Sequence, residues 1–381
     1  MNTLPKGFVG AGIRAGIKAS GNPDLALIVN QGPLNFGTAV FTSNQVVAAP
    51  VMWSRQVVAD HEVSAVLLNS GGANACTGPD GFLDTHKSAE KVAEILGVSS
   101  GDVVVCSTGL IGERLPMEKI LHGIENAAAS LSGDSGLDCA TAIMTTDSHP
   151  KLYEAEIFGV RIFGMAKGAG MLAPSLATML CVIALDAIVS KNAQSIFEDV
   201  VSRTFNRIDS DGCTSTNDTV LLMVSGASGI TLDDDSLRKL LFDCTDFLAQ
   251  SLIGDAEGHS KIVAVRTINA ASEEDAVEVG RACARNNLLK CALHGEDPNW
   301  GRVLAAIGTT SAIFDPHTID VSLNGVMVCQ NSAPGADRTL VSMKEKQIEI
   351  LIDLKAGDQE ATIWTNDLTA MYVHENSSYA S

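Results

Sequence analysis

Residues 167–185 read KGAGMLAPSLATMLCVIAL, a glycine-rich and proline-containing turn followed by a short, continuously apolar run. Such a run, bounded by turn residues, is typical of a strand that is buried on both faces. Thr178 lies at the end of this turn, just before the predicted strand. If the peptide bond before a threonine is broken, the freed α-amine can serve as the base that activates its weakly nucleophilic hydroxyl. The stretch therefore fits a self-cleaving enzyme, but it equally suits an ordinary loop that enters a buried strand.

Strand and helix patterns alternate along the rest of the chain. Apolar runs and 3.6-residue periodicity predict strands at 25–29, 65–69, 103–106 and 262–267, and helices near 89–96, 117–131, 193–205, 237–251 and 275–284. Two hairpins are expected as well, one turning at Asn324-Gly325 and one through 355–359, which would join 348–353 to 361–364. Residues 133–151 look like a connecting region. The alternation predicts an α/β protein, and without a long linker we expect its lobes to be interleaved.

The composition excludes several classes of protein. The chain has 381 residues, of which 46% are hydrophobic, enough for more than one lobe. A net charge of −19 argues against nucleic-acid and anionic-membrane partners. No apolar run approaches a membrane span of ~18 residues and the N-terminus lacks a signal-peptide pattern, so we expect a cytoplasmic protein. The nine cysteines include no Cys-x-x-Cys pair, so we expect neither a disulfide framework nor a metal site.

The segment 107–112, STGLIG, is a second place where chemistry could occur. It follows a predicted strand and precedes a predicted helix, and tight turns of this kind hold the donors that stabilise a developing oxyanion. The same turn is also explained by ordinary capping, in which Ser and Thr bind backbone groups and Gly relieves strain. In such an acidic chain, an anionic substrate needs a local cation, and Lys167 is a candidate.

Several separated motifs resemble, in the same order, those of the ornithine acetyltransferase family, the glutamate N-acetyltransferases of arginine biosynthesis. The matching segments are NSGGANACTG at 69–78, STGLIG at 107–112, MTTD at 144–147, ATML at 177–180, EGHSK at 257–261, EDPNWGR at 296–302 and the tail 366–381. The resemblance runs from Pro5 to Ser381. It implies a layered αββα sandwich that cleaves itself at Ala177-Thr178 into interleaved α and β chains, residues 1–177 and 178–381.

The resemblance also implies roles for individual residues. Thr178 would be the nucleophile, and the Thr108 hydroxyl and Gly109 N–H would form the oxyanion hole. Substrate binding would involve Thr145, Lys167 for a carboxylate or carbonyl, Glu257 for an ammonium, and Asn376 and Ser381 from a tail folded over the substrate. At His259-Ser260 the family usually has Ala-Thr, a departure that could alter substrate fit or pH response.

By similarity, the enzyme would move acetyl from N-acetylornithine to glutamate through an acetyl-Thr178 intermediate, without a metal or cofactor and as an α2β2 heterotetramer. Three alternatives remain open from the residues. Acetyl-CoA could be a second acetyl donor, as in bifunctional members of the family. The chain could instead be an amidase or aminopeptidase of the same fold, although those enzymes use serine where this chain has Thr178, or an uncleaved ligand-binding relative.

Overall fold

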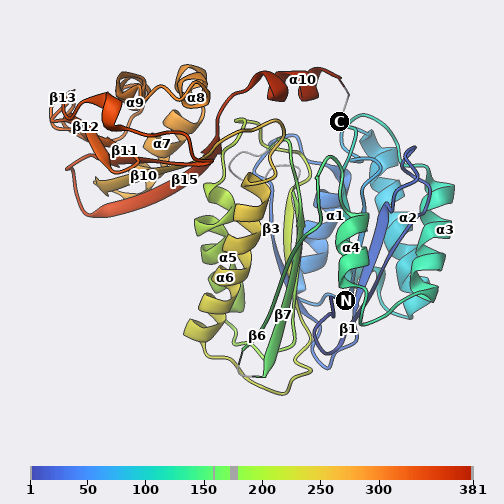
Figure 1. Ribbon diagram of the computed structural model, residues 1–381. Helices are drawn as coiled ribbons and strands as arrows, with labels where there is room; N and C mark the ends of the chain where they lie inside the picture. The colour runs from blue at the N-terminus through green and yellow to red at the C-terminus, as the bar shows by residue number, and fades with distance from the viewer. Residues whose placement is uncertain (1, 158, 172–178, 379–381) are drawn as a thin grey trace.

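The structure is a computed structural model that describes residues 2–157, 159–171 and 179–378. Its larger part is a sandwich of two sheets with helices on both outer faces (Figure 1). The four-stranded sheet has the order β1 (Phe8–Ile13), β2 (Leu25–Asn30), β4 (Ala65–Asn69), β5 (Val103–Ser107). The five-stranded sheet has the order β3 (Phe36–Phe41), β9 (Thr219–Val224), β8 (Leu180–Leu185), β7 (Val160–Lys167), β6 (Lys151–Ile157). The layered αββα sandwich is thus confirmed.

Strand β8 shows why the two sheets pack face to face. All six of its residues are buried, as expected for a continuously apolar strand. Because side chains alternate along a strand, one set lies between the two sheets: Leu180, Val182 and Ala184. The other set lies under the helices: Cys181, Ile183 and Leu185.

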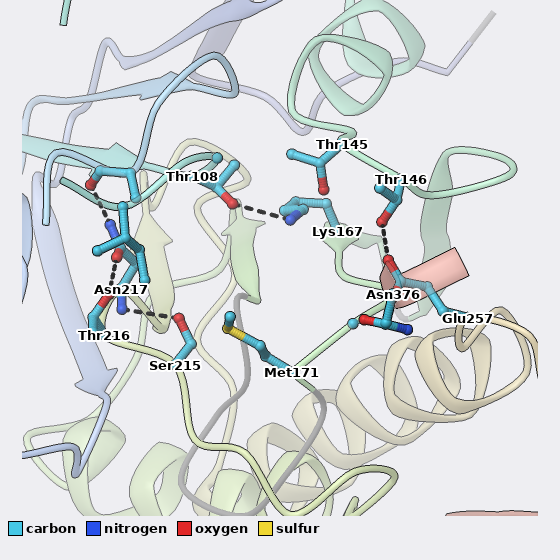
Figure 2. Close-up of a pocket in the computed structure, with 14 residues that line it drawn as sticks. Thr108, Thr145, Thr146, Lys167, Met171, Ser215, Thr216, Asn217, Glu257 and Asn376 are labelled. Atoms are coloured by element: carbon cyan, nitrogen blue, oxygen red, sulfur yellow. Dashed lines mark hydrogen bonds between the residues drawn. The ribbon is translucent and has the colours of Figure 1, made fainter. Parts of the chain in front are cut away.

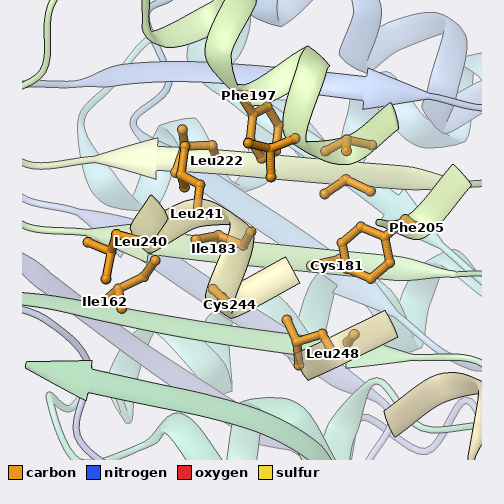
Figure 3. Close-up of a cluster of buried hydrophobic side chains, with 14 of the residues drawn as sticks. Ile162, Cys181, Ile183, Phe197, Phe205, Leu222, Leu240, Leu241, Cys244 and Leu248 are labelled. Atoms are coloured by element: carbon orange, nitrogen blue, oxygen red, sulfur yellow. The ribbon is translucent and has the colours of Figure 1, made fainter. Parts of the chain in front are cut away.

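Two helices cover each outer face. On the five-stranded sheet they are α5 (Ala193–Arg203) and α6 (Asp234–Ile253), whose apolar stripes meet β8 and β9 in the cluster of Figure 3. On the four-stranded sheet they are α2 (Gly78–Leu96) and α3 (Met117–Ala129). Helix α2 ends at Gly97, whose φ of 70° is the left-handed conformation that glycine adopts readily. The periodicity placed all four helices correctly, although α2 begins earlier than expected.

Two shorter helices pack near the sheet edges. Helix α1 (Ala49–Val57) contacts β5 and is followed by the 3₁₀ turn Val58–Asp60. Helix α4 (Gly136–Ala142) contacts β1, β2 and β7 and contributes to the core between the sheets. The sequence indicated only a connecting region here. The helix was missed because its seven residues are mostly small and too few to show a periodic pattern.

The five-stranded sheet draws its strands from both sides of residues 177 and 178. Strands β3, β6 and β7 precede this point in the chain, whereas β8 and β9 follow it. Strand β8 is central, because it pairs antiparallel with β7 and parallel with β9. Strands that precede the Ala177-Thr178 bond in the chain therefore flank, within one sheet, the strands that follow it.

A second lobe has its own core and comes from one continuous segment, unlike the interleaved arrangement expected for all lobes (Figure 1). Its six-stranded sheet has the order β13 (Ala333–Pro334), β12 (Val326–Gln330), β11 (Asp320–Leu323), β14 (Gln347–Asp353), β10 (Ile262–Ala270), β15 (Gln359–Asn366). Three helices pack on this sheet: α7 (Glu273–Ala284), α8 (Asn287–His294) and α9 (Trp300–Ile307). A last helix, α10 (Ala370–Ser378), returns to the sandwich.

The two expected hairpins have different outcomes. The turn at Asn324-Gly325 joins β11 and β12, with φ values of 45° and 81° that suit this residue pair. The prediction of the second hairpin is wrong, because β14 and β15 do not pair with each other. Strand β10 lies between them, parallel to β14 and antiparallel to β15, and the connection crosses the end of β10, where Ala356 N–H binds Asn269 O at 2.7 Å. Local turn signals could not reveal a strand inserted from elsewhere in the chain.

Candidate active site

One pocket lies at the edge of the sandwich where β5 and β7 end and β8 and β9 begin. It gathers residues from segments that are far apart in the sequence: Ala73, Thr108, Gly109, Ile111, Thr145, Thr146, Lys167, Gly170, Met171, Ser215, Thr216, Asn217, Glu257 and Asn376. Figure 2 shows Thr108 and Lys167 between a wall formed by residues 215–217 and a group that includes Glu257 and Asn376. Six residues proposed from the sequence therefore line one pocket: Thr108, Gly109, Thr145, Lys167, Glu257 and Asn376.

Thr108 and Gly109 occupy the turn immediately after β5. Thr108 is fully buried, and its Oγ1 accepts a hydrogen bond from Lys167 Nζ at 3.1 Å. Because a hydroxyl both accepts and donates, this contact leaves the Thr108 O–H available as a donor. Gly109 has a φ of 132°, and a Cβ built there would lie 2.7 Å from Gly72 N. Only glycine fits at position 109, and the turn brings two possible oxyanion donors to the pocket.

The segment 69–78 forms backbone hydrogen bonds with this turn. Gly72 N–H donates to Thr108 O at 3.0 Å, and Ala73 N–H donates to Leu110 O at 3.0 Å. A Cβ at Gly71 would lie 2.1 Å from the side chain of Ile17, which explains a small residue there. The glycines of this motif thus permit close packing of two loops, and Ala73 also reaches the pocket.

Lys167 is the last residue of β7 and is 1% exposed. Burial lowers the pKa of Lys167 to about 8, although the negative charge of Asp147 opposes the shift. Burial also tends to raise the pKa of Asp147, but the charges of Lys167 and Lys151 and a hydrogen bond from Gly168 N–H outweigh burial and hold it at about 2. The pocket therefore contains a buried cation whose charged form burial disfavours, and such a cation is a suitable partner for an anionic group of a ligand.

A buried ion cluster fixes the loop that carries Thr145 and Thr146. Lys151 Nζ lies 2.6 Å from Asp147 Oδ1 and 2.6 Å from Asp255 Oδ2. Asp147 Oδ2 in turn accepts the Thr145 N–H at 2.9 Å. The sequence analysis did not identify Lys151, because a contact with Asp255, 104 residues away, leaves no local pattern.

Glu257 faces the pocket from the segment between α6 and β10. Its Oε1 accepts a hydrogen bond from Thr146 Oγ1 at 2.7 Å, and its N–H donates to Ala169 O at 2.9 Å. A Cβ at Gly170 would lie 2.6 Å from Glu257 Oε2, so the glycine-rich turn is shaped to admit this carboxylate. Glu257 places negative charge in the same pocket as the ammonium of Lys167.

Helix α10 brings Asn376 to the pocket from the end of the chain. It docks closely against 256–258, because a Cβ at Gly258 would lie 2.2 Å from Tyr372 N. The Thr369 hydroxyl donates to Gly258 O in the same contact. Asn376, which is exposed, is the residue of this helix that lines the pocket.

Three predicted site residues, Ala177, Thr178 and Ser381, lie outside the described residues. His259 is not among the residues that line the pocket, and its Nδ1 lies 2.5 Å from Ala256 O. This departure lies in the turn that follows Glu257.

The wall formed by Ser215, Thr216 and Asn217 was not identified from the sequence. Asn217 Nδ2 donates to Ala73 O at 2.6 Å and to Ser107 O at 2.8 Å, so it ties the wall to the two loops described above. A signal existed, because the polar run 214–218 directly precedes the buried strand β9. Polar residues at the end of a buried strand are candidates for a site.

The arrangement suits a small molecule with opposite charges. Lys167 offers a cation and Glu257 an anion, while the Thr108 O–H and Gly109 N–H can stabilise negative charge on a carbonyl oxygen. Within the described ranges, no three His, Cys, Asp or Glu side chains are grouped so as to hold a metal ion. None of the helices in the described part of the chain is both long and apolar enough to cross a membrane.

Comparison with known proteins agrees with the motifs. Residues 10–381 match the model of the ArgJ family. The arginine biosynthesis bifunctional protein ArgJ of Streptomyces coelicolor is 59% identical over 380 residues, covering 100% of this chain and 99% of that protein. The protein of the same name from Mycobacterium tuberculosis is 50% identical over 392 residues, covering 100% of this chain and 96% of its own.

Two solved structures are similar to parts of this chain. A crystal structure of the ornithine acetyltransferase of Mycobacterium tuberculosis complexed with ornithine is 51% identical over 45% of this chain and 94% of that chain, with a TM-score of 0.42. The arginine biosynthesis bifunctional protein ArgJ of Bacillus halodurans is 30% identical over 51% of this chain and 96% of its own, with a TM-score of 0.48. The family resemblance drawn from the motifs is confirmed by the full-length matches, and the chain belongs to the ArgJ family.

Proposed function

We propose that this chain is an acetyltransferase of arginine biosynthesis that cleaves itself at Ala177-Thr178 and transfers acetyl from N-acetylornithine to glutamate. The observation that carries the proposal is the pocket beside the start of β8, which collects the motif residues from both sides of this bond. Membership of the ArgJ family supports the same conclusion. The two pieces, residues 1–177 and 178–381, would remain together because they share the five-stranded sheet.

The chemistry follows from the residues around the pocket. The α-amine of Thr178 takes the proton from its own hydroxyl, and Oγ1 attacks the acetyl carbonyl of N-acetylornithine. The Thr108 O–H and Gly109 N–H stabilise the resulting oxyanion. When the C–N bond breaks, the proton passes from the α-amine to the leaving nitrogen, and ornithine departs. The α-amine of glutamate then attacks the acetyl-Thr178 ester, which regenerates Thr178 and releases N-acetylglutamate.

Two charged residues would orient the substrates during this exchange. Lys167 binds a substrate carboxylate or polarises its carbonyl, and Glu257 binds an ammonium group. Thr145 contacts the substrate, and Asn376 and Ser381 cover it from the C-terminal segment. The exclusion of water by this segment matters, because hydrolysis of the ester would release acetate instead.

The relatives named bifunctional favour a second acetyl donor for this chain as well. Acetyl-CoA would acylate Thr178 in place of N-acetylornithine, and the second half of the reaction would be unchanged. No cofactor takes part in either route. We further propose a cytoplasmic enzyme that assembles as two αβ units, which light scattering of the purified protein tests directly.

A denaturing mass measurement tests the central step. The active enzyme should give two pieces that begin at Met1 and Thr178, and N-acetylornithine without glutamate should add one acetyl group to the second piece. Thr178→Ala should stay uncut and inactive. Thr178→Ser is the matched control, because it keeps a hydroxyl and should still be cut. An active enzyme that remains one chain would overturn the mechanism, and release of acetate with no transfer to glutamate would identify an amidase.

A further inference from the structure

A second cavity lies next to the pocket described above, and the proposed mechanism does not use it. Its volume of about 350 Å³ is within the range of about 300–1,000 Å³ that is usual for small-molecule sites. Glu257 lines both cavities. The loop before β9 and helix α10 also serve both, because they contribute 210–212 and Tyr372 to this cavity and 215–217 and Asn376 to the pocket. The two cavities are therefore neighbours that share Glu257.

Lys290 supplies a buried cation to this second cavity. It belongs to α8, lines the cavity and is 5% exposed. Its Nζ donates to Ser210 O at 2.6 Å and to Thr365 Oγ1 at 3.0 Å, and both acceptors are neutral. An ammonium has three donors, and Lys290 forms no ion pair with any residue that the structure describes. Because a buried charge is stabilised by a paired charge, this lysine is a suitable partner for the carboxylate of a ligand.

Lys290 resembles Lys167 in its burial, its pKa and its position at a cavity. Burial lowers the pKa of each lysine to about 8. The charges of Asp209, Asp211 and Asp367 oppose the shift at Lys290. Each lysine lines its cavity, and the two cavities share one carboxylate. The chain therefore has a second buried cation of the kind that is proposed to bind substrate at the first pocket.

Carboxylates that can bind an ammonium group line the same cavity. They are Asp211, Glu257 and Asp367. Asp367 is held by the protein, because its Oδ1 accepts two backbone N–H groups at 2.9 and 2.8 Å. Burial raises the pKa of Tyr372 to about 12, and the charges of Asp211, Glu257 and Cys213 add to this rise. Asp211 and Glu257 therefore lie near the same hydroxyl group of the cavity wall.

The other cation of the cavity wall already has a carboxylate partner. Arg285 Nε donates to Asp209 Oδ2 at 2.7 Å, and Asp209 is 0% exposed. A ligand with one carboxylate can thus be bound by Lys290. A second carboxylate would lie near Asp211 and Glu257 and would be repelled.

We propose that this cavity is a second ligand site, which takes a free amino acid with one carboxylate. Lys290 binds the carboxylate, and Asp211 and Glu257 accept hydrogen bonds from a positively charged amino group. A carboxylate has about four acceptor positions, so Glu257 can serve both cavities at once. The inference goes beyond the proposed function, because binding at this site requires neither cleavage nor acetyl transfer.

Isothermal titration calorimetry with ornithine tests the proposal. Ornithine has one carboxylate and two ammonium groups, and the full protein should bind two molecules for each 381-residue chain. Lys290→Met should weaken binding at the second site by about 10-fold or more, because it removes the charge that pairs with the carboxylate. Lys167→Met is the matched control, since it changes the corresponding lysine of the first pocket and should leave the second site intact. Glutamate, with two carboxylates, should occupy one site only.

The results separate the possible outcomes. One ornithine for each parent chain, or two sites of unchanged affinity in Lys290→Met, overturns the proposal, and two bound glutamates overturn the assignment to one carboxylate. If Lys290→Met does not fold, Lys290→Gln replaces it, because an amide keeps donors for Ser210 O and Thr365 Oγ1 while it removes the charge. A folded Lys290→Gln protein with two unchanged sites overturns the proposal as well. Loss of a site in Lys290→Met with no change in Lys167→Met would instead contradict the proposed role of Lys167, so the two failures are distinguishable.

Discussion

Lys151 and Lys167 are both buried and both lie beside Asp147, yet they are held in different ways. Lys151 Nζ lies 2.6 Å from each of two carboxylates, so its charge is balanced within the protein. Lys167 Nζ donates to the neutral Thr108 hydroxyl at 3.1 Å and borders the pocket, and burial lowers its pKa to about 8. Burial of a lysine therefore does not by itself indicate a functional site. A buried lysine indicates a site when it borders a cavity and burial lowers its pKa.

Removal of Lys151 should have the largest effect and tests the structural side of the comparison. Lys151→Met leaves Asp147 and Asp255 without the cation between them, and breaking such a pair costs about 3–5 kcal/mol of unfolding free energy. Lys167→Met is the matched control and should cost less, because Lys167 borders the pocket whereas Lys151 lies between two carboxylates. Urea unfolding measures both. Equal losses would show that the two lysines have the same structural role.

Thr108, the partner of Lys167, should matter for turnover rather than for folding. Thr108→Val keeps the shape of the side chain and removes the donor, so kcat should fall by about 10²-fold or more with little change in acetylornithine binding. Thr216→Val removes a buried hydroxyl from the opposite wall of the pocket and should change kcat by only a few-fold. A cut and folded Thr108→Val enzyme that turns over within a few-fold of the parent would make Thr108 a capping residue of the turn.

Lys167 should in turn matter for the use of substrate. Lys167→Ala removes a charge-assisted contact worth about 1.5–3 kcal/mol of transition-state stabilisation. We therefore expect kcat/KM to fall roughly 10- to 150-fold. The melting temperature should change little. Steady-state kinetics and thermal unfolding of the same preparation provide the check. If stability and activity fall together, Lys167 is structural like Lys151 and the distinction between them fails.

The smallest expected effect is a pH dependence that runs in opposite directions for binding and stability. With a pKa of about 8, Lys167 loses its charge as the pH rises through that value, and binding of a substrate carboxylate should weaken. The unfolded lysine keeps its proton to about pH 10.5. Below pH 8 the buried ammonium lowers the free energy of unfolding by its full desolvation cost. Between pH 8 and 10.5 the folded lysine is neutral and this cost disappears. Rising pH should therefore increase the free energy of unfolding while it weakens substrate binding. Kinetics and urea unfolding between pH 7 and 10 would detect both trends, and Lys167→Arg should remove both.

The sequence was informative where function depends on local segments. Thr108, Lys167 and Glu257 each belong to a short motif, and each lies at the pocket as expected. The apolar run after Thr178 also predicted β8, because continuous burial on both faces leaves a simple pattern.

The remaining features depend on contacts between distant segments. The insertion of β10 between β14 and β15 cannot be recognised from turn residues, and neither can the cluster of Lys151, Asp147 and Asp255. These features therefore depend on pairing between distant segments, which the local composition does not reveal.

The central position of β8 has a consequence for how such a protein can be made. If the two pieces were translated separately, residues 1–177 would carry β7 without the neighbour that completes its hydrogen bonds, and the other piece would carry β8 with one edge unpaired. Exposed strand edges of this kind pair with other chains and aggregate. A single reading frame keeps both edges on one molecule until the sheet has closed. Division of the gene at this bond should therefore yield insoluble products, whereas the proposed cleavage after folding would yield a two-chain enzyme.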